Sequence, residues 1–309
     1  MDDDRLTNAS ISTMWAINNY PDLNDFFKVA ISMGFQMVEL NHQVGTGMLA
    51  QVNFDHHKLS SIHEPCPADI STKERVDRDW LISATLEENR TRGVQAVKKS
   101  VDLAKKLAAP VVVMHCGTVP FALNHESKLR SLLKAGKEAT EEFHLIKAEF
   151  EQHRQNLVRP RLQAVQNSLA ELLEYAGEAH IKIGLENRYH YMDIPSIDEM
   201  EELLGLADST SLGFIYDVGH AQALDRLGFY PHDEWLIRFS SRMIGCHLHD
   251  VIGLTDHYAP GLGEIDFNHI AKYLPERAFR TVEILPGNTL AQVSNGIKIL
   301  AQVGCIRYL

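Results

Sequence analysis

The chain has 309 residues, a hydrophobic fraction of 45% and a formal net charge of −11 at pH 7. This length suits one large α/β barrel, and the hydrophobic fraction is typical of a globular protein with a large core. The acidic balance argues against a surface that coats nucleic acid. No apolar run approaches the roughly 18 residues of a membrane span, and the acidic start MDDDRLTNAS lacks an apolar signal region. We therefore expect a cytoplasmic protein with no membrane partner.

Strand and helix patterns alternate along the whole chain. Short apolar runs predict strands over residues 10–17, 36–40, 59–63, 110–115, 181–186, 212–217, 243–247 and 280–285. Runs with helical periodicity lie between them, at 22–35, 93–109, 196–207 and 288–304, and several begin at a capping residue such as Asp22 or Ser196. Eight strands alternating with helices predict a (β/α)8 TIM barrel that forms a single domain. The four cysteines have no CxxC spacing, so we expect reduced, buried thiols.

One segment exceeds what a minimal barrel needs. Residues 126–176 are rich in Lys, Glu, Gln, Ala and Leu, with few helix breakers before Pro160. We interpret them as a charged inserted helix, within an insertion at about 124–158, followed by the barrel helix after strand four. A solvated addition is the favoured interpretation, and a dimerisation helix or an active-site lid is the alternative. Dimers and tetramers are ordinary for such proteins, so a homo-oligomer is one expectation.

Acidic and imidazole side chains stand at the ends of the later strands. Glu186 ends IKIGLE, Asp217 ends FIYD, His247 lies in CHLHD, and Glu283 follows the last strand. The carboxyl ends of barrel strands meet at one face, where such side chains converge. A buried carboxylate needs a cation, an arginine or several hydrogen bonds. A mixed carboxylate and imidazole set suits zinc, manganese, cobalt or iron, so these four residues are predicted to bind a divalent metal ion. The alternative is a structural salt bridge, with Arg188 as a partner.

Further candidates lie in the same loops. His63, His115, His220 and His257 are candidates for additional metal ligands or for substrate binding, and strand-end histidines also often form only local hydrogen bonds. His247 and His249 alternate on one strand and point the same way, so only one need be a ligand. We prefer His247, and expect Asp250 to orient an imidazole.

In its motifs the chain resembles the xylose isomerase-like TIM barrel superfamily, which includes sugar phosphate isomerases, epimerases and endonuclease IV-type nucleases. The motifs are LEN, YDVGH, HLHD, GLGEIDF and VEI, in this order, and the resemblance covers essentially the whole chain. For the sugar enzymes it implies that one divalent ion has four ligands, Glu186, Asp217, His247 and Glu283. His220 would then bind substrate.

The endonuclease IV branch of this superfamily implies more ligands. His63 lies in an HxP motif, His115 in HxG, and His257 precedes PGLG, which would nearly complete a three-zinc cluster. Two departures argue against the nuclease. Thr255 stands where that branch has an aspartate, with Asp256 displaced by one place, and Cys66 replaces a tyrosine that wedges into DNA. A small-molecule sugar or sugar phosphate is therefore the expected partner, and nucleic acid is not.

The chemistry expected is isomerisation or epimerisation through an enediolate. A divalent ion stabilises the enediolate, and two carboxylates remove and return the proton. Glu186 and Glu283, from strands five and eight, are the predicted acid and base, while Arg188 and His220 would hold hydroxyls or a phosphate. Trp15 and Tyr189 could line a sugar face or simply pack.

The alternative function is a multi-zinc phosphodiesterase of the abasic-site nuclease type. A degenerate barrel retained only for binding is a third hypothesis. GxSxG, Walker and GxGxxG motifs are absent from the sequence.

Overall fold

A closed barrel of eight parallel strands forms the centre of the molecule in the computed structural model, which describes residues 5–121 and 124–309. The strands follow the chain around the barrel and the last closes onto the first. Every one falls within or overlaps a predicted strand, so the (β/α)8 fold is confirmed as a single domain. The barrel strands are β2 (Ala9–Ser12), β3 (Met37–Leu40), β4 (Lys58–His63), β5 (Val111–Met114), β6 (Lys182–Glu186), β7 (Leu212–Asp217), β8 (Met243–Leu248) and β11 (Phe279–Val282).

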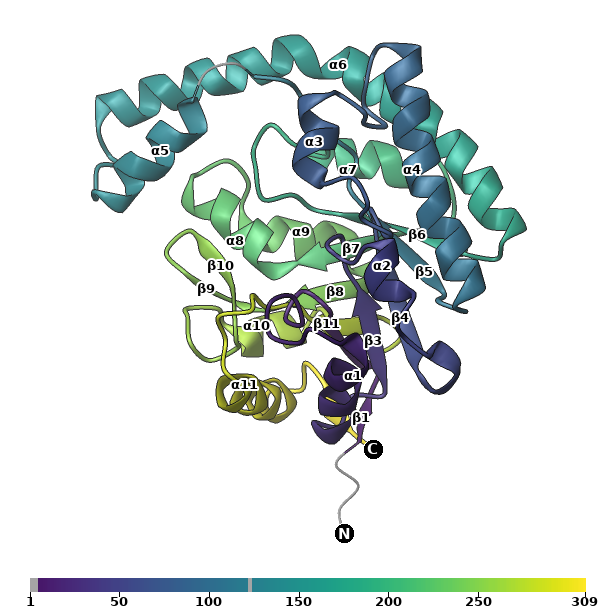
Figure 1. Cartoon of the computed structure of the whole chain (residues 1–309). Coiled ribbons are helices and arrows are strands. Elements are labelled where there is room, and N and C mark those ends of the chain that lie inside the picture. The colour runs from purple at the N-terminus through teal and green to yellow at the C-terminus, as the bar shows by residue number, and fades with distance from the viewer. Residues whose placement is uncertain (1–4, 122–123) are drawn as a thin grey trace.

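Helices surround this barrel (Figure 1). The predicted caps are present: Asp22 accepts a hydrogen bond from the Asn24 amide, and Ser196 forms a capping box with Glu199. The helices outside the insertion are α1 (Leu23–Ser32), α2 (Thr46–Leu49), α3 (Thr72–Asp77), α4 (Glu87–Lys106), α7 (Ile197–Leu204), α8 (Val218–Arg226), α9 (His232–Phe239), α10 (Phe267–Ala271) and α11 (Leu290–Gln302), with 3-10 turns η1 (Phe54–His56) and η2 (Ser240–Arg242).

Two small antiparallel pairs complete the structure. Strand β1 (Leu6–Thr7) pairs with β12 (Arg307–Tyr308) and joins the two ends of the described chain. Strand β9 (Asp250–Ile252) pairs with β10 (Thr255–Tyr258) in a hairpin directly after β8. All four cysteines are free and buried, as predicted. The N-terminal segment MDDDRLTNAS was expected to contain no signal peptide. Its first residues, 1–4, lie outside the described residues.

The insertion differs from the prediction. It comprises a short helix, α5 (His125–Lys134), and one helix of 38 residues, α6 (Glu141–Glu178), which continues through Pro160. Proline removes a helical hydrogen bond and normally kinks or ends a helix. Here buried arginines fix α6 on both sides of the proline: Arg154 binds both carboxylate oxygens of Glu199 at 2.7 Å, and Arg161 contacts Asp79 at 2.5 Å. Tertiary contacts therefore override the local signal, and the expected charged helix and barrel helix are one element.

Figure 1 shows α6 running along one side of the molecule with α5 folded back against its N-terminal part. Despite its length, α6 is amphipathic and charged. Among the residues that the structure describes, no helix combines the length and the apolar character needed to cross a bilayer.

Glycines in the neighbouring strands β6 and β7 make room for large side chains inside the barrel. A Cβ added to Gly213 would lie 2.4 Å from Ile244 Cγ2, and one added to Gly184 would lie 2.6 Å from Ile215 Cγ1. Ile215 and Ile244 form a buried cluster with Val111 and Val113. This apolar plug fills the barrel beneath the strand ends, so the polar residues above it rest on a packed support.

We predict that Gly213→Ala lowers the free energy of unfolding by about 1–3 kcal/mol, because the new methyl group overpacks the interior against Ile244. Denaturant unfolding measures the change. Gly177→Ala is the control: this glycine lies in α6 with nothing within 4 Å of an added Cβ. The control should be neutral or slightly stabilising, since alanine favours helix. Equal stability of wild type and Gly213→Ala would contradict the packing described.

Candidate metal centre

Four predicted ligands meet at the carboxyl end of the barrel. Glu186 and Asp217 end β6 and β7, His247 lies near the end of β8, and Glu283 follows β11. Parallel pairing places Asp217 beside His247 on adjacent strands. All four side chains are buried, and one potential ligand atom from each lies within 4.8 Å of the others. The His247 Nδ1 atom is 2.6 Å from Glu186 Oε1, 3.0 Å from Glu283 Oε2 and 3.6 Å from Asp217 Oδ2. The structure thus brings together the set expected from the strand ends.

A second group of potential ligands lies on the β4–β6 side and consists of His63, His115 and Glu186. His63 Nε2 and His115 Nε2 are 2.8 Å apart, and His115 Nε2 is 3.1 Å from Glu186 Oε2. His63 ends β4, and His115 directly follows β5. Glu186 therefore belongs to both groups, through its two carboxylate oxygens.

A third group lies on the opposite side, around Asp217, His220 and His257. The Nδ1–H of His220 donates to the Asn187 carbonyl at 2.9 Å, so its Nε2 keeps a lone pair. Asp256 lies 3.0 Å from His257 Nδ1 and 3.9 Å from His220 Nε2. Although Asp256 is displaced by one place from the nuclease pattern, its carboxylate still reaches this group, whereas Thr255 is exposed.

The geometry separates His247 from His249. The His257 backbone N–H donates to His249 Nδ1 at 2.9 Å, and His249 Nε2 lies 3.1 Å from both oxygens of Asp217. Both ring nitrogens of His249 are therefore engaged, and its N–H orients the Asp217 carboxylate. His247 remains the candidate ligand, in agreement with the expectation.

The expectation for Asp250 was wrong. Its carboxylate accepts hydrogen bonds from the backbone N–H groups of Val251, Gly261 and Ile265 at 2.8–3.0 Å, and no imidazole contacts it among the hydrogen bonds of the described residues. Asp250 thus holds the glycine-rich loop before α10. The Gly261 amide, which could have faced a substrate phosphate, is used within the protein.

Sequence reasoning missed two residues of the site. Glu39, inside β3, lies with its Oε2 atom 3.2 Å from His247 Nε2. His42 follows that strand, and its ring centroid is 5.3 Å from that of His63. Burial lowers the pKa of His42 to about 4, so its imidazole is neutral. The strand-end rule that selected Glu186 would also have selected Glu39, which is the penultimate residue of the run QMVEL.

Arg188 and the aromatic candidates also have defined places. Arg188 Nη1 lies 2.6 Å from Glu186 Oε2, so the salt bridge considered as an alternative does form. Trp15 is buried and donates its indole N–H to the Asn288 carbonyl, which makes it a packing residue. Tyr189 lies beside the site, with its ring centroid 5.8 Å from that of His220.

One arginine does not balance the buried charge. Burial alone would raise the pKa of Glu186, but His63, His115 and His247 together hold it well below its usual value. Burial likewise opposes charge on His247, yet Glu283 and Glu39 raise its pKa well above the usual value. In the protein without a cation, protonated imidazoles therefore act as counter-charges for ionised carboxylates.

Four buried atoms of the site form no hydrogen bond of good geometry, although the last two are 2.6 Å apart. They are Glu39 Oε1, His63 Nδ1, Glu186 Oε1 and His247 Nδ1. An unpaired buried polar atom is costly, and oxygen and imidazole nitrogen atoms are ligands that zinc and similar ions prefer. The residues therefore fit a divalent cation.

A cavity of about 590 Å³ opens beside this site, lined at its inner end by His115 and Arg188. Its other walls are mainly apolar, and include Leu81, Val119 and Met192. The volume is in the range of small-molecule binding sites.

The fold and the site define a TIM barrel with groups of potential metal ligands at its carboxyl face. Residues 27–300 match the family described as the xylose isomerase-like TIM barrel, and the chain belongs to this family. The uncharacterized protein MJ1311 of Methanocaldococcus jannaschii is 24% identical over 219 residues, which are 70% of this chain and 64% of that protein. The chain thus covers less than two thirds of the length of this relative.

Solved structures share the fold at low identity. A D-tagatose 3-epimerase-like protein is 20% identical with a TM-score of 0.65, over 96% of this chain and 97% of that chain. An IOLI protein with a bound zinc atom is 14% identical with a TM-score of 0.66, over 96% and 98%. The 3-keto-D-glucoside 4-epimerase YcjR from E. coli is 14% identical with a TM-score of 0.60, over 96% and 99%. The solved structures that share this fold thus include a D-tagatose 3-epimerase-like protein, a sugar epimerase and a protein with a bound zinc atom.

We predict that zinc binding releases protons and that the apparent affinity for zinc rises with pH. His247 has a pKa raised well above the usual value, so it holds a proton near neutral pH that a cation bound by the four-residue group must displace. Glu186, Asp217 and Glu283 have lowered pKa values and release no proton there. Zinc titration by calorimetry in buffers of different ionisation enthalpy counts the protons. Binding without proton release, or affinity that falls as pH rises, would contradict this charge balance.

Proposed function

We propose that this protein is a divalent-metal-dependent isomerase or epimerase that acts on a sugar or sugar phosphate. The observation that carries the proposal is the buried group of Glu186, Asp217, His247 and Glu283, in which one potential ligand atom from each residue lies within 4.8 Å of the others. The fold shared with sugar epimerases supports the same class. Zinc, manganese, cobalt and iron are the metals that this set of nitrogen and oxygen atoms suits.

A divalent cation held by these four residues would supply Lewis acidity for the negative charge that develops on the sugar oxygens of an enediolate. The protein's own task is to move a proton. Glu186 and Glu283 come from strands β6 and β11, and both carboxylates have lowered pKa values, so each is ionised and able to accept a proton. One glutamate takes the proton from a carbon beside the carbonyl. The other returns a proton, either to the opposite face of that carbon or to its neighbour.

The neighbours of the two glutamates suit these tasks. Glu186 Oε2 is held by Arg188 at 2.6 Å, which fixes the direction of its carboxylate. Glu283 Oε2 lies 3.6 Å from His257 Nε2, and the raised pKa of His257 lets this imidazolium supply the proton that Glu283 returns. Arg188 and His115 also border the cavity, from which a sugar would approach. His63, His220 and His257 are proposed to contact substrate hydroxyls when one cation is bound.

We predict that Glu186→Gln and Glu283→Gln each lower turnover by about 10²–10⁴-fold, because an amide cannot exchange a proton with the substrate carbon. The assay is a panel of ketoses and ketose phosphates with each divalent ion in D2O, followed by mass spectrometry and NMR. The wild-type enzyme should form an isomer or epimer that carries deuterium at the reacting carbon.

The matched control is Glu199→Gln, which removes another buried carboxylate, paired with Arg154 outside the site. This control should keep its activity, and circular dichroism should show all variants folded. Unchanged activity in either active-site variant would remove that glutamate from the mechanism. Isomerisation without deuterium uptake would be evidence against the proton transfer itself.

A second candidate function is an endonuclease IV-like multi-zinc phosphodiesterase. The observation that favours it is the pair of ligand groups around His63 and His257, which flank the first and share Glu186 and Asp217 with it. Cys66 is buried at 1% exposure, so no side chain projects from that position as a wedge into DNA. The net charge of −11 also opposes binding to a phosphate backbone.

Metal analysis and one cleavage assay separate the two functions. About one metal ion per chain, with activity on a ketose and none on an abasic oligonucleotide, supports the isomerase or epimerase. Three zinc ions per chain with cleavage of that oligonucleotide would replace it by the nuclease.

A further inference from the structure

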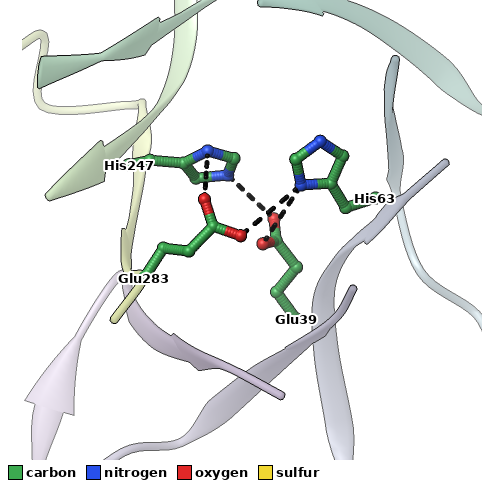
Figure 2. Close-up of side chains that lie close together, drawn as sticks. All are labelled: Glu39, His63, His247 and Glu283. Atoms are coloured by element: carbon green, nitrogen blue, oxygen red, sulfur yellow. Dashed lines mark hydrogen bonds and ion pairs between the residues drawn. The ribbon is translucent and has the colours of Figure 1, made fainter. Parts of the chain in front are cut away.

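Glu39 lies below the proposed ligands, at a position where its carboxylate touches two of their imidazoles. Figure 2 shows it between His63 and His247, with Glu283 beside them. Glu39 Oε2 is 3.2 Å from His247 Nε2, and Glu39 Oε1 is 3.9 Å from His63 Nδ1. The side chain is completely buried, and Ser61 Oγ–H fixes it by donating to Oε2 at 2.6 Å.

The nitrogen of His247 that Glu39 contacts is not the one that faces the ligand group. His247 uses Nδ1 toward Glu186, Asp217 and Glu283 and presents Nε2 to Glu39. His63 Nδ1 lies nearer to Glu283 Oε1, at 3.6 Å, than to Glu39. The Glu39 carboxylate therefore lies behind the His247 ring, on the side away from the ligand group of that histidine.

A neutral imidazole has one N–H and one lone pair, and a carboxylate only accepts hydrogen bonds. A carboxylate behind the ring therefore keeps the proton on the rear nitrogen and leaves the lone pair on the front nitrogen. Carboxylates placed in this way are known to fix the tautomer of metal-binding histidines and to raise their basicity.

We propose that Glu39 is a positioning residue that sets the tautomer of His247, so that His247 Nδ1 is the atom that binds metal. This inference rests on the proposed metal centre. It also explains why Glu39, His63, His247 and Glu283 lie close enough to hold a cation themselves. The His247 imidazole would need a second lone pair to serve that group as well as its own, so Glu39 supports the neighbouring group and binds no metal.

The decisive variant is Glu39→Gln, which keeps the shape of the side chain. A carboxamide carries no negative charge, and its single oxygen is shared with the Ser61 hydroxyl, so it holds the proton on His247 Nε2 less strongly. We expect zinc affinity, measured by competition with a chelator, to fall about 10- to 100-fold.

Long-range 1H–15N spectra of the zinc-loaded proteins read the tautomers directly. In the wild type we expect a proton on His247 Nε2, and in Glu39→Gln we expect part of the protein to carry it on Nδ1 instead. Glu199→Gln is the control for loss of a buried carboxylate, and its zinc affinity and imidazole signals should match those of the wild type. If Glu39→Gln does not fold, Ser61→Ala tests the same contact, with a smaller loss of zinc affinity expected.

The outcomes distinguish this inference from the proposed function. A wild type that binds zinc, with a proton on His247 Nδ1, would overturn the role of Glu39 alone. Unchanged affinity and tautomers in Glu39→Gln, or a zinc ion coordinated by Glu39 itself, would do the same. A wild type that binds no zinc would overturn the metal centre and this role together.

Discussion

Excess negative charge, buried at the carboxyl end of the barrel, is the constraint on which this site depends. Glu39, Glu186, Asp217 and Glu283 are at most 2% exposed, and the guanidinium of Arg188 contacts only Glu186 among them. Isolated charges at such depth cost several kcal/mol each unless they are paired. Without a cation, imidazoles must hold protons to balance these carboxylates. A divalent ion held by these residues would replace protons with a charge placed among the carboxylates, which is why the proposed function gives this site a cation.

The three groups of potential ligands share residues. The proposed chemistry therefore depends on how many cations bind. Glu186 belongs to the first and second groups, and Asp217 to the first and third. With one cation, Glu186 keeps an oxygen for the substrate, as proton transfer requires. With three, both of its oxygens would be bound, and its basicity would be lost to the metals. The two functions proposed for this chain, carbon-acid chemistry and phosphodiester hydrolysis, would therefore differ in how many cations these side chains hold.

The sequence was informative where the position of a residue on a strand determines its direction. Parallel strands buried on both faces give continuous apolar runs, and their ends converge, so Glu186, Asp217, His247 and Glu283 could be placed together. Glu39 obeys the same rule but lies one residue before the end of its run. Contacts made by distant segments could not be read in this way. Asp250 binds the amides of a loop 11–15 residues later. The arginines that hold α6 on either side of Pro160 bind Glu199 in α7 and Asp79 after α3.

The insertion connects to the substrate side of the site rather than to the metal ligands. On α5, Glu126 accepts hydrogen bonds from His190 Nδ1 and from the Tyr191 amide, and Arg130 donates to the Tyr189 hydroxyl and carbonyl. The loop that these contacts hold begins with Arg188, so a helix more than 50 residues earlier helps to fix the guanidinium beside Glu186. The interpretation of the insertion as a merely solvated addition therefore omits a structural role.

The candidate metal ligands and the residues around the cavity are supported by different parts of the structure. Ligands on barrel strands are held rigidly by the sheet and by the apolar plug beneath it, whereas Arg188, Tyr189 and the cavity wall depend on loops and on α5. Sites built on strands are positioned more accurately than sites built on loops. If the proposed function holds, a change in α5 would therefore alter which sugar is accepted and leave the cation site intact. Because loops are where barrels with a common metal centre differ in substrate, the insertion is where the specificity of this chain is expected to reside.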